Sequence, residues 1–100
     1  MIIRIVKLQF EKERTIEFLD FFETIKSSIN TFPGCQGMKL LHDIQNPNIV
    51  MTYSHWDNEN ALNSYRTSEL FGTVWSRIKP WFDAKPEAWS VIEHFNGFEK

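Results

Sequence analysis

The 100-residue sequence has one cysteine, four glycines that are not clustered, and no long apolar run. The single Cys35 excludes an intrachain disulfide, and the scattered glycines exclude a glycine-rich phosphate loop. No apolar stretch approaches the roughly 20 residues needed to span a membrane, and Arg4 and Lys7 interrupt any signal-like start. We therefore expect a soluble protein in the reducing cytoplasm, with no membrane partner.

The charged residues are balanced and dispersed, with 11 basic and 13 acidic side chains and a net charge of −2. No basic cluster is present, which argues against a nucleic-acid partner. The histidines, His42, His55 and His94, fall on three different predicted strands and lack the spacing of metal ligands. The sequence therefore predicts neither a metal site nor a bound cofactor.

Along the sequence, segments with a strand-like spacing of apolar residues are interspersed with segments that have a helical spacing. Apolar residues alternate with a period of two in four segments, which predicts strands over 1–10, 35–44, 49–56 and 88–95. The period is helical over 11–32, where Ile16 is expected to begin the apolar stripe. It is also helical over 58–66 and in a piece that begins after Ser68 and ends or kinks at Pro80. We expect Asp57 to cap the second helix and residues 96–100 to form a frayed tail.

This order, β-α-β-β-α-β, predicts a single α+β domain over residues 1–100 with the ferredoxin-like fold. In that fold a four-stranded antiparallel sheet carries its helices on one face. Here both faces are apolar, because Ile3 and Ile5 oppose Val6 and Leu8 on the first strand. A monomer would leave a large apolar patch in water, so we expect a homodimer whose sheets pack face to face.

The aromatic residues concentrate in the second half of the chain. All four tryptophans, Trp56, Trp75, Trp81 and Trp89, follow residue 55. Trp56 at the end of a strand and Trp75 on a helical stripe are candidates for either core or pocket wall. Trp81 is expected to pack beneath a loop, and Trp89 to pack or face a dimer partner.

The chain resembles the antibiotic biosynthesis monooxygenase (ABM) family of dimeric α/β-barrel proteins. The resemblance rests on the opening strand 2–10, the Phe32-Pro33-Gly34-Cys35 break, the turn around Asn46-Pro47-Asn48, Trp56, and the Ser68-Glu69-Leu70-Phe71 element. It implies a homodimer whose sheets close into a barrel, with a pocket between sheet and helices in each subunit.

The haem-degrading members of this family imply three signature residues. Trp56 matches their strand-ending tryptophan, but Trp75 stands where they carry the axial histidine, and no asparagine occurs near Lys7. The missing axial ligand argues against haem degradation.

The quinol-forming members imply a monooxygenase without metal or flavin, acting on a small aromatic or quinol-like compound. Trp56, Tyr65 and Trp75 are the expected pocket walls, and Arg4, Arg66 and His55 are expected to polarise a phenolate. We assign His55 and Arg66 as candidate catalytic residues, and Trp56, Tyr65, Trp75 and Arg4 as candidate substrate-binding residues.

Several alternatives stay open at this point. His55 is equally described as a partly exposed residue at a strand end, and Cys35 as a buried inert thiol. Arg4 either pairs with Glu93, which is the simplest solution, or points into a pocket. The domain as a whole is either the monooxygenase or a non-catalytic small-molecule binding or sensor domain. An RNA-binding domain of the same strand order would need basic and aromatic residues that strands 1–10 and 49–56 lack.

Overall fold

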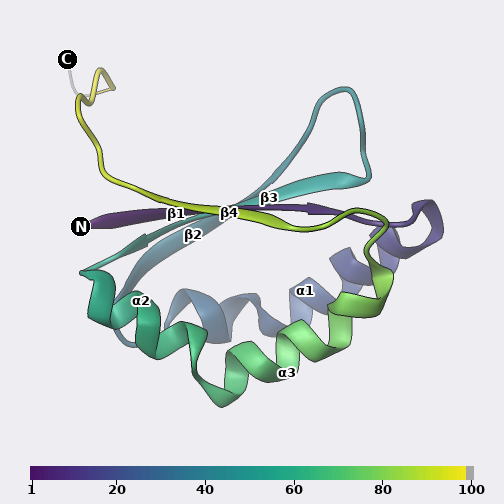
Figure 1. The fold of residues 1–100 in the computed structure, drawn as a ribbon, viewed down its shortest axis with the longest axis horizontal. Helices are drawn as coiled ribbons and strands as arrows, with labels where there is room; N and C mark the ends of the chain where they lie inside the picture. Colours follow the sequence, from purple (N-terminus) through teal and green to yellow (C-terminus); the bar gives the residue numbers. More distant parts are fainter. Residues whose placement is uncertain (99–100) are drawn as a thin grey trace.

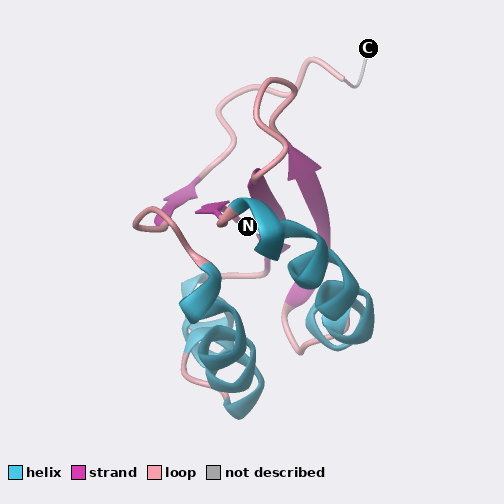
Figure 2. Ribbon diagram, turned by 90° about the vertical axis from the view of Figure 1, so that its right-hand side faces the viewer, coloured by secondary structure: helices cyan, strands magenta, loops and turns pink. Residues whose placement is uncertain are grey.

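The computed structural model describes residues 1–98 and shows one four-stranded antiparallel sheet with all helices beneath one face (Figures 1 and 2). The α+β ferredoxin-like fold is thus confirmed. The strands are β1 (Ile2–Gln9), β2 (Cys35–His42), β3 (Ile49–Trp56) and β4 (Glu87–Val91). The α-helices are α1 (Thr15–Asn30), α2 (Glu59–Arg66) and α3 (Glu69–Ile78), with short 3-10 turns at Lys12–Arg14 and Lys79–Trp81. Within the described residues, no helix has the length and apolarity to cross a bilayer.

Strand β1 lies inside the sheet, whose order is β2-β3-β1-β4. It pairs with β3 from Ile2↔Trp56 to Gln9↔Ile49, and with β4 from Ile3↔Val91 to Lys7↔Glu87. Because side chains alternate along a strand, Arg4 and its period-two neighbours share the helix-covered face with Trp56. The opposite face, which we call the open face, carries the residues in register with Ile5.

Helix α1 is shorter than the predicted segment 11–32, because the chain first makes the 3-10 turn at Lys12–Arg14. The turn changes which residues face the sheet. Ile16, expected on the apolar stripe, is 70% exposed, whereas Thr15 is buried and its Oγ1 donates a hydrogen bond to Asn48 Oδ1 at 2.7 Å. The prediction for Ile16 was wrong, since the sequence period alone does not fix the rotation of a helix about its axis.

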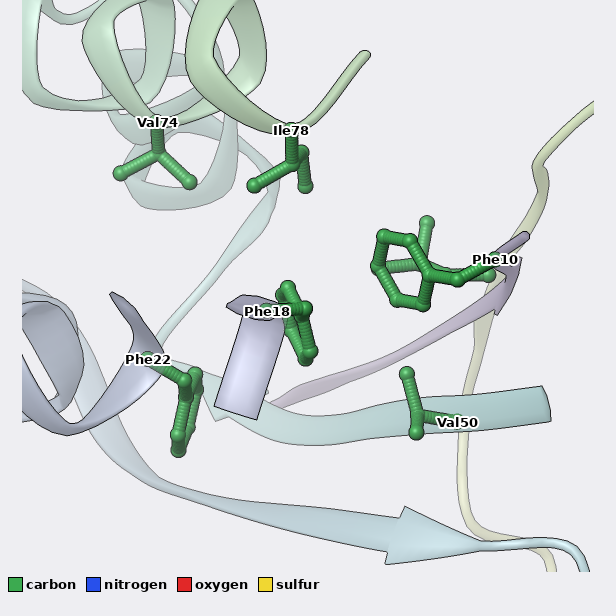
Figure 3. Close-up of a cluster of buried hydrophobic side chains, with 7 residues drawn as sticks. Phe10, Phe18, Phe22, Val50, Val74 and Ile78 are labelled. Atoms are coloured by element: carbon green, nitrogen blue, oxygen red, sulfur yellow. The ribbon is translucent and has the colours of Figure 1, made fainter. Parts of the chain in front are cut away.

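The core gathers where α1 and α3 meet the sheet. Its buried members are Leu8, Phe10, Phe18, Phe22, Val50, Val74 and Ile78. Val74 and Ile78 point from α3 toward the phenylalanine rings, which lie above Val50 of β3 (Figure 3). The rings of Phe10 and Phe18 stack with their centroids 4.5 Å apart, which fixes the end of β1 against α1.

Strand β4 was predicted to span 88–95 but ends at Val91. Val91 pairs with Ile3, and β1 begins at Ile2, so β4 runs out of residues to pair with. The chain beyond Val91 leaves the sheet (Figure 1) and exposes Phe95 and Phe98 almost fully. Residues 96–98 of the predicted frayed tail are outside regular structure, and 99–100 lie outside the described residues.

The second helical region is broken as expected, although one cap differs. Asn58, not Asp57, caps α2, and its Oδ1 accepts a hydrogen bond from the Ala61 amide at 2.8 Å. Ser68 caps α3, and Pro80 lies in the 3-10 turn that follows Ile78. The break between α2 and α3 lets the two helices follow the length of the sheet (Figure 1).

One glycine fixes the approach of α2 to the start of β2. Gly34 has φ +88°, and a Cβ at this position would lie 2.5 Å from Ala61 Cβ. Its carbonyl accepts a hydrogen bond from the Asp57 amide at 2.9 Å. Both the backbone conformation and the close approach therefore require glycine here.

We predict that Gly34→Ala lowers the free energy of unfolding by about 2 kcal/mol or more, because it adds backbone strain and a steric overlap. The matched control is Gly72→Ala in α3, where a Cβ meets nothing within 4 Å. That change should raise the free energy of unfolding by up to about 1 kcal/mol through helix propensity. Urea denaturation of the two variants measures the difference, and equal effects would contradict the assignment of Gly34.

Candidate functional site

A cavity of about 560 Å³ lies between the helices and the helix-covered face of the sheet. Its volume is in the usual range for small-molecule sites, about 300–1,000 Å³. Most of the lining is apolar and comes from α1, α3 and the two central strands. The lining includes Val6, Leu8, Phe18, Phe22, Ile25, Ile29, Met38, Leu62, Phe71, Val74 and Ile78. Five of the six predicted site residues also line it: Arg4, Trp56, Tyr65, Arg66 and Trp75.

Four aromatic rings form a continuous wall along one side of the cavity. Trp56 and Tyr65 stack with centroids 4.9 Å apart, and Tyr65 meets Phe71 edge to face at 5.2 Å. Phe71 in turn stacks on Trp75 at 5.7 Å, with the two rings nearly parallel. Neighbouring rings limit each other's rotation, so the wall is pre-formed and presents flat apolar surface to a ligand.

Trp56 serves as both core and wall, which were alternatives in the sequence. It is 1% exposed, and its indole Nε1 donates a hydrogen bond to Ser54 Oγ at 2.9 Å. Phe32 packs edge to face against the indole at 6.3 Å. These contacts satisfy the only polar atom of the indole and fix the ring plane against Tyr65.

Two arginines contribute to the lining of the cavity. Arg4 projects from β1, and Arg66 is the last residue of α2. Arg4 Nη1 donates a hydrogen bond to Ser90 Oγ at 2.9 Å. Burial lowers the pKa of Arg4, and the nearby positive charge of Arg66 lowers it further.

Arg4 does not pair with Glu93, so the simpler of the two expectations was wrong. Glu93 lies beyond the end of β4, in the segment that leaves the sheet. Ser90, on β4 and in register with Arg4, takes the guanidinium hydrogen bond instead. Since Ser90 carries no charge, the positive charge of Arg4 remains directed at the cavity.

Tyr65 brings a phenol to the aromatic wall. Burial, with a smaller electrostatic contribution from the nearby Cys35, raises the pKa of Tyr65 to about 12. The hydroxyl is therefore protonated throughout the physiological range. It can donate a hydrogen bond to an anion, but it does not act as a phenolate base.

The structure does not bring His55 into the cavity. Its neighbour Trp56 faces the helices, so the alternation of β3 turns His55 to the open face. There its Nε2 lies 3.0 Å from the Tyr53 hydroxyl. His55 thus lies across the sheet from the other five predicted residues.

The remaining tryptophans and the cysteine have simpler environments. Trp81 packs edge to face against Phe21 at 6.3 Å, which is the packing role expected of it. Trp89 lies on the open face and is 44% exposed. Cys35 is partly exposed, not buried as expected, because it begins the edge strand β2.

Sequence reasoning missed the small polar residues of the lining. Thr52, Ser54, Asn63 and Thr67 line the cavity together with the predicted residues. Thr52 and Ser54 share the alternating face of β3 with Trp56, which was the available signal; Asn63 had none. Across residues 1–98, no three His, Cys, Asp or Glu side chains gather in a way that could hold a metal ion.

Three comparisons relate the chain to known proteins. No curated protein matches it. A conserved protein from Methanosarcina mazei Go1 is 22% identical, with a TM-score of 0.83 over 91% of each chain. Rv0793 from Mycobacterium tuberculosis is 8% identical, with a TM-score of 0.86 over 96% of this chain and 97% of that one. A solved antibiotic biosynthesis monooxygenase is 16% identical, with a TM-score of 0.86 over 93% and 98%. These similarities show the fold.

The family assignment rests on a different comparison. The family model described as "Antibiotic biosynthesis monooxygenase" matches residues 1–75, which run from β1 into α3. All five predicted residues that line the cavity lie within the matched part, whereas β4 lies outside it. The chain therefore belongs to the antibiotic biosynthesis monooxygenase (ABM) family.

Proposed function

We propose that the protein is a cofactor-independent monooxygenase that oxidises a small aromatic or quinol-like compound. The observation that carries the proposal is the cavity itself, whose lining combines a flat aromatic wall with two arginines. A planar ring would stack against Trp56, Tyr65 and Trp75. Its phenolic oxygen would then face Arg66 and Arg4. Membership of the ABM family supports this assignment.

In this reaction the substrate is its own reductant. The phenol loses a proton, and the anion transfers one electron to O₂. The resulting radicals combine in a C–O bond at a ring carbon. The peroxide so formed takes up the proton that the phenol lost. Its O–O bond then breaks as the ring carbon gives up its hydrogen, so a quinone and one water leave. One oxygen atom of O₂ enters the product and the other becomes water.

The residues of the cavity assist the loss of the proton in the first step and exclude water during the later steps. The guanidinium groups of Arg4 and Arg66 stabilise the phenolate and so favour loss of its proton. The apolar lining keeps water away from the radical pair. Arg66 is therefore the catalytic residue that we retain, with Arg4 beside it, whereas His55 faces the other side of the sheet.

One observation favours the alternative, a non-catalytic binding or sensor domain. The lining residues include no histidine. Their one carboxylate, that of Glu87, forms a salt bridge with Lys7, whose Nζ lies 3.9 Å away. A substrate would thus have to lose its proton without a dedicated base nearby. A phenol that binds without being ionised would occupy the same cavity and give no reaction.

We expect the protein to consume O₂ in the presence of an oxidisable phenol or quinol, and Arg66→Gln to slow the uptake at least about tenfold. Arg77→Gln is the matched control, since Arg77 lies over the Phe21 ring outside the cavity. An oxygen electrode and a panel of one- to three-ring phenols provide the measurement. Stabilisation on heating with these compounds, without O₂ uptake, would establish the binding domain instead.

The protonated Tyr65 leads to a prediction about stability at high pH. Its folded pKa of about 12 lies above the ordinary tyrosine value of about 10. The folded state therefore holds this proton more tightly. The associated stability is complete below pH 10 and is lost as the pH rises toward 12. Between pH 9.5 and 11.5 the free energy of unfolding should fall less steeply in Tyr65→Phe than in the wild-type protein. Parallel slopes in urea denaturation would contradict this.

We also propose that the protein is a homodimer joined through the open face. Tyr53, Ile5 and Trp89 form a row across three strands of that face. Leu41 and Val91 extend the apolar surface and are 44% and 39% exposed. A second copy of the same sheet would cover this surface, and two sheets packed in this way form the expected barrel.

We expect light scattering at micromolar concentration to give twice the monomer mass of 11.9 kDa. Trp89→Lys should give the monomer, because it places a charge within the apolar surface. Ile16→Lys is the matched control, since Ile16 is exposed on α1 and away from the open face. A wild-type monomer, or a Trp89→Lys dimer, would sink the proposal.

Finally, we propose a cytoplasmic location without membrane or nucleic-acid partners. The free, partly exposed Cys35 and the dispersed basic residues support this.

A further inference from the structure

The two guanidinium groups of the cavity form an unusual pair. Arg4 and Arg66 come from elements far apart in the sequence, yet both line the same cavity. They lie close enough for the charge of Arg66 to contribute, after burial, to the lowered pKa of Arg4. Arg4 is half-buried and Arg66 is exposed, so solvent weakens the repulsion between the two like charges.

Nothing in the described protein neutralises this pair. The salt bridges within residues 1–98 involve Lys7, Arg14 and Lys26, and not Arg4 or Arg66. The one side-chain hydrogen bond of Arg4 goes to the uncharged Ser90. A guanidinium group has five N–H donors, so most of the donor capacity of both groups is available to a ligand.

The shape of the cavity restricts the ligand further. A phenolate oxygen uses one guanidinium group, but two such groups match a ligand with two oxyanions. A carboxylate fits the planar fork of a guanidinium group with two parallel hydrogen bonds. The aromatic rings of the lining, Trp56 and Tyr65 among them, favour a flat ring in the rest of the ligand.

We propose that the substrate is an aromatic carboxylate, in which a carboxylate stands on the ring beside the oxidisable phenol. The inference rests on the proposed function for the identity of the reacting phenol. The carboxylate binds one guanidinium group, and the phenolate faces the other. The cavity thus selects hydroxyaryl carboxylates over neutral phenols of the same size.

The test compares two ligands of equal shape, 1-hydroxy-2-naphthoate and 1-hydroxy-2-naphthamide, in titration calorimetry without oxygen. The wild-type protein should bind the carboxylate at least about tenfold more tightly than the amide. Arg66→Gln should abolish most of this preference, while Arg77→Gln should keep it. High salt should weaken the preference, as expected for binding between charges.

Equal affinities in the wild-type protein, or no binding of either ligand, would overturn the inference. So would a preference that survives in both Arg66→Gln and Arg4→Gln, since the carboxylate would then bind elsewhere. A preference that depends on Arg66, in a protein that consumes no O₂ with any phenol, would uphold the inference and refute the monooxygenase. O₂ uptake with neutral phenols and no carboxylate preference would have the opposite meaning.

Discussion

The constraint on which the structure depends is the position of β1 inside the sheet. Because β3 and β4 pair with its two edges, β1 contributes side chains to the middle of both faces of the sheet. Arg4, Val6 and Leu8 form the floor of the cavity, and Ile3 and Ile5 belong to the open face. A shift of one residue in the register would exchange the two sets and remove Arg4 from the cavity.

The cavity and the core share residues, because Leu8, Phe18 and Phe22 belong to both. Around Phe10 and Phe18 the helices and the sheet pack closely, and the two rings stack 4.5 Å apart (Figure 3). Trp56 and Tyr65 stack on each other and line the cavity outside this cluster. The protein thus divides a single layer of aromatic residues between stability and binding.

The sequence was sufficient for the order of the elements and for the fold, and five of the six residues that it offered as site candidates line the cavity. Strand alternation is a local signal, so the predicted bounds of β3, residues 49–56, are the observed ones. The failures had non-local causes. Ile16 was predicted on the wrong face because the 3-10 turn at Lys12–Arg14 sets the rotation of α1. Strand β4 was predicted to be too long because its partner β1 begins at Ile2 and offers no residues for further pairing. His55 was proposed because it lies at the end of a strand, but its side chain lies on the face of Tyr53, across the sheet from the cavity. The partner of Arg4 depended on a pairing register that no local pattern encodes.

The close approach of Gly34 to Ala61 has a consequence for how this protein can change over evolution. Gly34 lies in the turn before β2 and Ala61 lies in α2, and their contact leaves no space for a side chain at position 34. Residue 61 lies one turn before Tyr65 on α2, so the contact also sets how far the tyrosine and Arg66 stand from the sheet. A lineage that replaced Gly34 would have to move this helix outward. The depth of the cavity, and with it the range of acceptable ligands, would then shift without any substitution in the lining itself.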